Sequence, residues 1–190
     1  MAATEREQLI ATVMPLLAET ERLKIEPLRA RHARLLFPVL ADPRLYTYVP
    51  ERPPKTVAAL AQRYAELNRG APVGSSETWL NWVVRLRSEP VWIGTLQATV
   101  FPTRIAYIGY VVSATYWSRG FATEGCNWLV RHLFDQLGAS EIRASVDTRN
   151  EASWRLLDRL GFVREGEHPL ELHGRPAVDY HYCLSRRRVP

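Results

Sequence analysis

The sequence predicts an α+β fold, with helices flanking a mixed, mostly antiparallel sheet. First, residues 80–112 show three strand-like segments joined by short turns that contain proline, the pattern of an antiparallel meander. Second, a strand, a helix and another strand follow one another between 105 and 146, which predicts a right-handed βαβ unit. Third, apolar side chains recur at helical spacing over 122–137, so one face of this helix should pack on the sheet.

The segments before the meander are expected to form helices and one strand. Residues 4–19 predict an extra helix that Pro15 bends or breaks, because proline interrupts helical hydrogen bonding. We therefore divide the chain into an N-terminal helical extension over 1–19 and one domain over 20–190. The next elements expected are a strand over 23–28, a helix over 30–40 ended by Asp42-Pro43, a helix over 56–67 and a loop over 70–76.

The meander and the βαβ unit account for the middle of the chain. Strands are expected at 80–86, 91–101, 105–112 and 141–146, with a helix from 121 to 137 between the last two. A further helix follows Asn150, and two terminal strands are expected near 162–165 and 177–184. The sequence contains no internal repeat and no second domain.

Residues 117–125 predict a phosphate-binding loop, because they join a strand to the start of a helix. There the backbone N–H groups and the positive end of the helix dipole point outward together, which favours a bound anion. Gly120 and Ala122 keep the side chains small, so that a diphosphate can approach the backbone. Arg119 either adds its charge to this contact or faces solvent. The expected contacts are Ser118, Arg119, Gly120, Phe121, Ala122 and Thr123.

Two segments carry a family resemblance: Trp-Ser-Arg-Gly-Phe-Ala-Thr-Glu-Gly over 117–125, and Asn-Glu-Ala-Ser to Leu-Gly-Phe over 150–162. Together they resemble the core of the GNAT N-acetyltransferase superfamily, nearest to its RimJ/RimL type of ribosomal-protein-alanine acetyltransferases. That branch carries a W-G-x-G-Y-A-T-E-A loop and an N-x-A-S…L-G-F helix. Residues 20–28 and 41–43 also resemble it, so the resemblance covers about residues 20–185. It implies a GNAT-like fold and acetyl-CoA as the acetyl donor.

Asn150 and Ser153 begin the helix of the second segment. Ser153 repeats with Leu156, Leu157 and Leu160 at helical spacing, which predicts that it faces the packed side. From the residues alone, Asn150 caps the helix and Ser153 bonds back to a carbonyl. The resemblance implies instead that Asn150 binds the pantetheine arm and that Ser153 lies near the sulfur as general acid. Many GNAT enzymes place a proton-donating tyrosine where this chain has Leu157.

Two further site residues, Val111 and Val112, follow from the resemblance alone. It implies that the strand ending in Val111 and Val112 splays from its neighbour, leaving backbone N–H groups for the acetyl carbonyl and the pantetheine amides. Such N–H groups would stabilise the oxyanion of the transition state. Glu124 is expected to complement the helix dipole. Glu171 is either a catalytic residue that polarises the amine or a surface carboxylate.

Composition excludes several other classes. The net charge is +5, but the arginines are scattered and the run over 186–188 fits solvated surface, so no DNA partner is expected. No apolar run reaches the ~20 residues of a membrane span, and the N-terminus is too polar for a secretory signal. Cys126 and Cys183 suit reduced thiols of a cytoplasmic protein. His168 and His173 lack metal-ligand spacing, and no Gly-x-Ser-x-Gly elbow indicates a serine hydrolase.

We expect direct acetyl transfer from acetyl-CoA to a primary amine in a ternary complex. The leading hypothesis is a protein N-terminal α-amine as acceptor, because with no strong base evident a low-pKa amine is the easier nucleophile. The second is a small amine such as an amino-sugar, polyamine or antibiotic, and the third is a non-catalytic module that binds acyl-CoA. Loops over 44–55, 68–77 and 166–176 are expected to shape the acceptor pocket, and a homodimer is left open.

Overall fold

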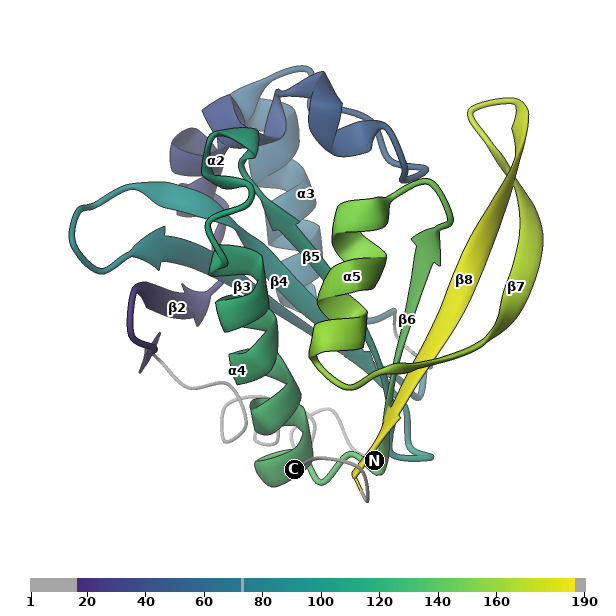
Figure 1. The fold of residues 1–190 in the computed structure, drawn as a ribbon. Helices are drawn as coiled ribbons and strands as arrows, with labels where there is room; N and C mark the ends of the chain where they lie inside the picture. Colours follow the sequence, from purple (N-terminus) through teal and green to yellow (C-terminus); the bar gives the residue numbers. More distant parts are fainter. Residues whose placement is uncertain (1–16, 73, 187–190) are drawn as a thin grey trace.

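The computed structural model describes residues 17–72 and 74–186. Within them, eight strands form one sheet in the order β1-β2-β3-β4-β5-β6-β8-β7 (Figure 1). The strands are β1 Ala18–Glu19, β2 Leu23–Pro27, β3 Thr78–Leu86, β4 Trp92–Val100, β5 Ile105–Val112, β6 Glu141–Asp147, β7 Val163–Leu172 and β8 Arg175–Ser185. The helices are α2 Ala33–Leu40, α3 Val57–Arg69, α4 Phe121–Asp135 and α5 Glu151–Arg159, with short 3-10 turns at η1 Ala30–His32, η2 Pro43–Tyr46 and η3 Ala114–Tyr116. The predicted α+β fold is confirmed.

Helices cover both faces of the sheet. Figure 1 shows α4 and α5 in front of it and α2 and α3 behind it, and we call these the front face and the rear face. Alternate residues of β3 from Leu80 to Leu86 are buried on the front face, as the sequence predicts. Val83 points the other way and is also buried, because it packs with α2 and α3.

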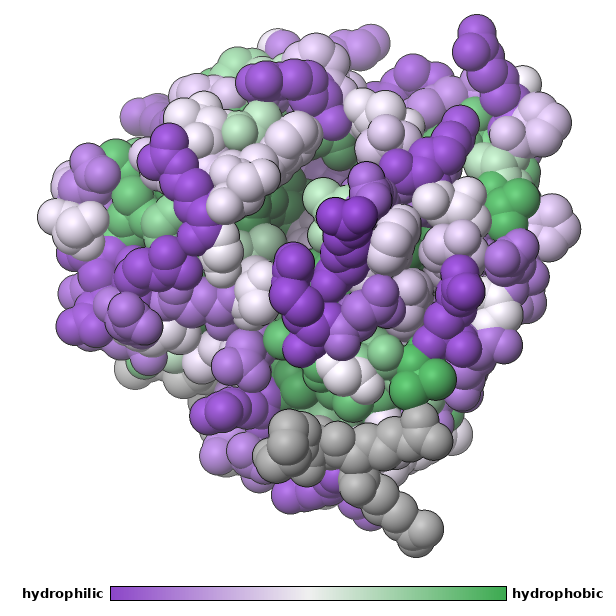
Figure 2. Space-filling view, in the orientation of Figure 1, coloured by the Kyte–Doolittle hydropathy of each residue, from purple (hydrophilic) through white to green (hydrophobic). Residues whose placement is uncertain are grey.

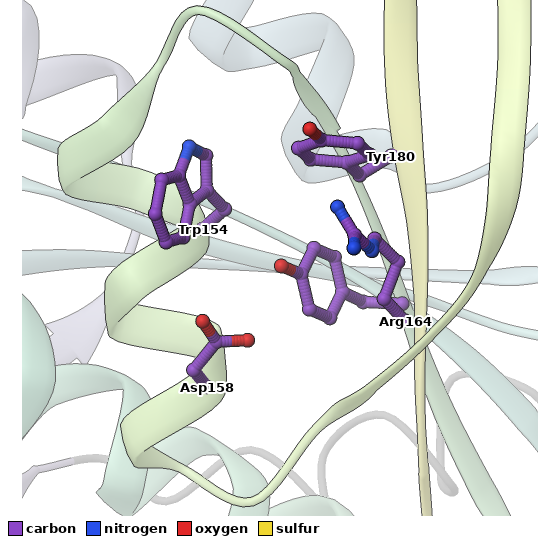
Figure 3. A pocket seen from close by; sticks show the side chains of 5 residues that line it. Trp154, Asp158, Arg164 and Tyr180 are labelled. Atoms are coloured by element: carbon purple, nitrogen blue, oxygen red, sulfur yellow. The ribbon is translucent and has the colours of Figure 1, made fainter.

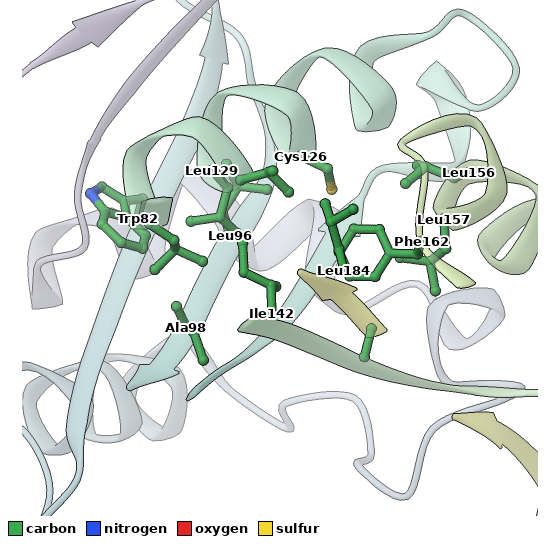
Figure 4. Close-up of a cluster of buried hydrophobic side chains, with 14 of the residues drawn as sticks. Trp82, Leu96, Ala98, Cys126, Leu129, Ile142, Leu156, Leu157, Phe162 and Leu184 are labelled. Atoms are coloured by element: carbon green, nitrogen blue, oxygen red, sulfur yellow. The ribbon is translucent and has the colours of Figure 1, made fainter. Parts of the chain in front are cut away.

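The front face holds the larger hydrophobic cluster (Figure 4). Leu129 and Leu133 of α4 are fully buried against Trp82 and Leu96 of the sheet. Leu157 of α5 is 1% exposed and belongs to the same cluster. Burying an aliphatic side chain of this size stabilises the fold by about 1.5–3 kcal/mol, so this packing fixes the two front helices on the sheet.

The βαβ unit is confirmed, and its two strands separate partway. β5 and β6 are parallel neighbours only where Ile105–Tyr107 lies beside Glu141–Arg143. Beyond that point β5 stays paired with β4 to Val112, and β6 stays paired with β8 to Asp147. The sheet therefore opens between 108–112 and 144–147, and we call this opening the splay.

Both ends of the described chain differ from the sequence-based expectation. Ala18–Glu19 forms β1, antiparallel to β2, rather than the last turn of the expected helix, because the chain turns back at once through the Thr20 N–H to Leu23 C=O bond. The rest of that helix, residues 4–16, lies outside the described residues. The strands expected near 162–165 and 177–184 are longer and form one hairpin, so 166–172 is strand rather than loop. Its turn needs only His173 and Gly174, which both adopt positive φ.

None of the described helices has the length and hydropathy that a membrane-spanning helix needs.

Candidate active site

The loop before α4 presents a row of unpaired backbone donors. Gly120 caps the helix with φ +81°, a left-handed conformation that glycine adopts without a Cβ penalty. The first intrahelical bond of α4 is donated by the Glu124 N–H to the Gly120 carbonyl. Among the described residues, no acceptor takes the N–H groups of 118–123. The loop therefore has the free main-chain donors that an anion site needs.

Arg22 lies in the turn between β1 and β2 and supports this loop, a role that the sequence analysis missed. Its guanidinium donates to the Arg119 carbonyl at 2.9 Å and pairs with Glu124 at 2.7 Å. Glu124 also accepts from the Thr20 hydroxyl at 2.5 Å and from the Arg22 N–H at 2.7 Å. Burial raises the pKa of Glu124, but these hydrogen bonds outweigh it and hold the pKa below its ordinary value. Glu124 thus holds the N-terminal strands to the loop, besides complementing the helix dipole.

The side chains of the loop face several ways. Arg119 is exposed, as one of its two expected roles requires, and its guanidinium lies over the Tyr116 ring at 5.4 Å. Trp117 is 49% exposed and donates its indole N–H to the Val112 carbonyl at 2.8 Å. This bond fastens the loop to the end of β5, beside the splay.

The sheet register decides which backbone groups enter the splay. The Ser113 N–H bonds to Ile93, so Ser113 belongs to the hydrogen-bonded pairs of the β4–β5 ladder. Because such pairs alternate along antiparallel strands, Val111 also bonds to β4, whereas Val112 and Tyr110 direct their N–H and C=O groups toward the splay. The expected free N–H therefore belongs to Val112. That of Val111 is committed to the β4 ladder, and its side chain packs with the rear cluster.

Asn150 and Ser153 lie together at the start of α5. Asn150 caps the helix and accepts from the Ser153 N–H at 3.3 Å, which confirms the capping interpretation. The Ser153 hydroxyl, unlike its backbone N–H, bonds to no carbonyl of the described residues. It lies 2.6 Å from the phenol oxygen of Tyr110 on β5. Tyr110 was missed in the sequence, although a polar side chain in register with Ile108 and Val112 should need a partner on the packed face.

Leu157 and Glu171 take no part in this arrangement. Leu157 lies in the hydrophobic cluster, so the absence of a tyrosine at that position leaves α5 without a phenol of its own. Glu171 is exposed on the hairpin, opposite Pro176. By strand alternation it points to the face opposite that of His168. The structure therefore brings together Asn150, Ser153 and Tyr110, but not Glu171.

A second group of titratable residues lies on the rear face next to the splay. Asp147 ends β6 and is 2% exposed, and Arg149 pairs with it through both carboxylate oxygens. That pairing lowers the pKa of Asp147. Asp179 of β8 lies directly across from Asp147 and, among the described residues, has no hydrogen-bond or ion-pair partner. Burial, and then the charge of Asp147, raise the pKa of Asp179.

Two chain segments border this rear-face group. Arg149 lies 5.9 Å from the Tyr48 ring, in the connection between α2 and α3. At the hairpin turn, a His173 ring nitrogen lies 3.2 Å from the Tyr46 carbonyl. Two of the three loops expected to shape the acceptor pocket therefore meet here.

The front face is hollowed between the loop before α4 and the start of α5, with hydrophobic side chains on its floor (Figure 2). A separate pocket of about 360 Å³ lies between α5 and the hairpin, lined by Trp154, Asp158, Arg164, Tyr180 and Tyr182 (Figure 3). Arg164 already stacks over Tyr180 in it, at 4.3 Å from the ring centre. No cluster of three metal-ligating side chains occurs in the part of the chain that the structure describes.

The chain is similar to known acetyltransferases. A model of an acetyltransferase (GNAT) domain matches residues 22–163. The chain is 30% identical over 150 residues to the uncharacterized N-acetyltransferase YoaA of Bacillus subtilis, a match that covers 78% of this chain and 83% of that protein.

Two solved structures have the same fold. Mycobacterium smegmatis RimJ in complex with CoA-disulfide matches with a TM-score of 0.80 at 22% identity, over 92% of this chain and 88% of that one. Spermidine N-acetyltransferase from Vibrio cholerae, in complex with CoA and spermine, matches with a TM-score of 0.75 at 19% identity, over 89% of this chain and 98% of that one.

Proposed function

The chain belongs to the GNAT acetyltransferase family, and we propose that it transfers the acetyl group of acetyl-CoA to a protein N-terminal α-amine. Acetyl transfer with acetyl-CoA as donor follows from the family. The acceptor, and the residues that act on it, are the proposal.

On the front face, the loop N–H groups from Ser118 to Thr123 bind the diphosphate of the donor. Asn150 binds the pantetheine arm, which runs into the splay. The Val112 N–H then receives the acetyl oxygen, and Ser153 lies on the side where the sulfur leaves. A prepositioned N–H at this place stabilises the charge that develops on the oxygen during attack.

The amine approaches from the rear face of the splay. Among the described residues, Asp179 is the carboxylate there with no hydrogen bond or ion pair, and the positive charges that act on it are the more remote ones of His181 and Arg149, whereas Asp147 pairs directly with Arg149. We assign Asp179, rather than the distant Glu171, to orient the amine and accept its proton. Its location supports this role, because it lies one strand away from the opening.

The observation that carries the choice of acceptor is that the proposed base is a single carboxylate, Asp179. Taking a proton from an α-amine of pKa ~7.8 costs about 1 kcal/mol at pH 7, whereas a lysine at ~10.4 costs roughly 4.6 kcal/mol. A carboxylate removes the first proton far more readily than the second. The fold shared with Mycobacterium smegmatis RimJ, solved in complex with CoA-disulfide, supports the donor side of the proposal.

A polyamine is the second candidate, because the fold is also that of a spermidine N-acetyltransferase. A polycation needs several free carboxylates along its length. The rear-face group supplies one, since Asp147 is paired with Arg149. The charge at this site therefore favours a single amine.

The test measures release of the CoA thiol with matched acceptors. One peptide carries a free N-terminal amine, a second has that amine blocked and one free lysine, and the third acceptor is spermidine. The proposal expects turnover with the first peptide to exceed the others by at least tenfold at pH 7, in line with the ~3.5 kcal/mol difference in deprotonation cost. Preferred turnover of spermidine would refute the proposed acceptor. Acetyl-CoA binding without CoA release from any amine would indicate a binding module.

A further inference from the structure

We propose that Tyr110 is a positioning residue for acetyl transfer: its phenol donates a hydrogen bond to Ser153 Oγ and so leaves the Ser153 proton free for the departing sulfur. This inference rests on the proposed function. It adds a residue from the central strand to a site otherwise built from α4, α5 and backbone groups.

Either hydroxyl could donate in this contact, and we assign the donor to Tyr110 from the contact lengths and the acidity of the phenol. Tyr110 Oη lies 2.6 Å from Ser153 Oγ and 3.4 Å from the Ser153 carbonyl oxygen. The first distance is within the 2.5–3.0 Å range of a good O–H···O bond, and the second exceeds it. A phenol is also a stronger acid than an aliphatic hydroxyl, so in a shared contact it is the preferred donor. The Ser153 hydroxyl is then the acceptor, and its own proton is directed elsewhere.

The surroundings of Tyr110 keep it in the donating form. Its side chain lies between β5 and α5, where the titratable groups whose charges act on it are Cys126 of α4 and Tyr182 of β8. Burial raises the pKa of Tyr110, more than the Ser153 bond lowers it. Burial likewise raises the pKa of Cys126. At physiological pH both neighbours are neutral and the phenol remains protonated.

The Tyr110–Ser153 contact matters because position 157 holds a leucine and not a tyrosine. Leu157 is one turn beyond Ser153, where a tyrosine could have reached the sulfur directly, but it is buried in the hydrophobic cluster. Tyr110 supplies a phenol from the neighbouring strand instead, and that phenol reaches Ser153 rather than the donor.

The chemical step then balances as follows. The amine nitrogen bonds to the acetyl carbon, and the carbon–sulfur bond breaks with its electron pair remaining on sulfur. Sulfur takes the proton of Ser153 Oγ, while the Tyr110 hydrogen bond stabilises the negative charge that develops on that oxygen. The proton lost by the nitrogen returns to Ser153 through Asp179 and solvent.

A double-mutant cycle tests the inference. Tyr110→Phe keeps the ring and removes the donor, so it should lower kcat about tenfold, the effect of losing ~1.4 kcal/mol of stabilisation in the transition state. The KM for acetyl-CoA should stay within about twofold, because a group that acts only in the transition state leaves binding unchanged. In a Ser153→Ala background, the same change should cost less than about twofold, since the two residues act as a unit. Tyr180→Phe, which removes a phenol oxygen outside this contact, should leave kcat unchanged.

Each outcome of the cycle decides the question. Additive losses from Tyr110→Phe and Ser153→Ala would show that Tyr110 does not act through Ser153. A variant with wild-type kcat but a lower melting temperature would show a structural role, and either result overturns the inference while the wild-type enzyme still turns over the N-terminal peptide. Wild-type protein that releases no CoA with any amine overturns the proposed function, and this inference with it.

Discussion

Replacing Gly120 with valine tests the phosphate loop most directly. Gly120 has φ +81°, and a Cβ there would lie 3.3 Å from Arg22 Nη2. Left-handed φ costs an ordinary residue about 1–2 kcal/mol, and β-branched residues rarely adopt it. The Arg22 guanidinium, which holds the Arg119 carbonyl, must also give way by a few tenths of an ångström. We therefore expect the loop to relax and its N–H groups to lose their common direction.

The magnitude follows from the donors that are lost. A hydrogen bond to a charged group contributes about 1.5–3 kcal/mol, so losing one phosphate contact weakens acetyl-CoA binding by roughly 10- to 150-fold. Gly138→Val is the matched control, because Gly138 has φ +63°, nothing lies within 4 Å of its Cβ position, and it follows the far end of α4. Both variants pay the backbone cost, but only the loop variant should lose affinity.

Calorimetric titration with acetyl-CoA gives the affinity, and urea unfolding gives the stability of each variant. If Gly120→Val lost the same stability as Gly138→Val yet bound acetyl-CoA as tightly as the wild type, the loop main chain would not be the diphosphate site.

Two further predictions concern carboxylates. Asp179→Asn should lower kcat/KM at least tenfold at neutral pH. It should also remove the fall in kcat/KM that the wild type shows as pH drops through the raised pKa of Asp179. Glu171→Gln should resemble the wild type, and equal losses in both variants would contradict the assignment of the base. Glu124→Gln should cost ~1–2 kcal/mol of unfolding free energy at pH 7, discounted because Arg22 is 43% exposed. The pKa of Glu124 is lowered in the fold, so its contribution to stability is complete above the pKa of the carboxyl in the unfolded chain and should fade as pH falls through the folded pKa. The control is Glu151→Gln, which breaks an exposed pair with Arg155. A cost of Glu124→Gln that is independent of pH, or no larger than that of the control, would refute the reasoning.

Local patterns made most of the fold predictable. The alternation along β3 and the helical spacing of α4 fixed those elements, and the parallel pairing of β5 and β6 followed from the helix between them. The hairpin was underestimated, because Gly166 and Pro169 interrupt the strand pattern. Both lie in β7, the edge strand of the sheet, where proline is accepted because the side without an N–H can face solvent.

In the candidate site too, local features could be predicted from the sequence and long-range contacts could not. The loop around Gly120 and the Asn150 cap are contiguous in sequence, so their geometry could be anticipated from spacing. Tyr110 meets Ser153 across 43 residues, and Arg22 meets Glu124 across 102. Such pairs depend on how the strands are ordered in the sheet. Asp179 likewise gained significance only when β8 was placed beside β6.

The hairpin contact between His173 and Tyr46 has a consequence for divergence of this enzyme. In the proposed site, the loops that border the incoming amine are the connection after α2 and the terminal hairpin, and both lie outside the 110–153 region proposed to bind acetyl-CoA. Exchanging those stretches with ones from another acetyltransferase should therefore redirect selectivity while the donor half keeps its affinity. Acceptor selectivity and acetyl-CoA binding would then depend on different segments of the chain.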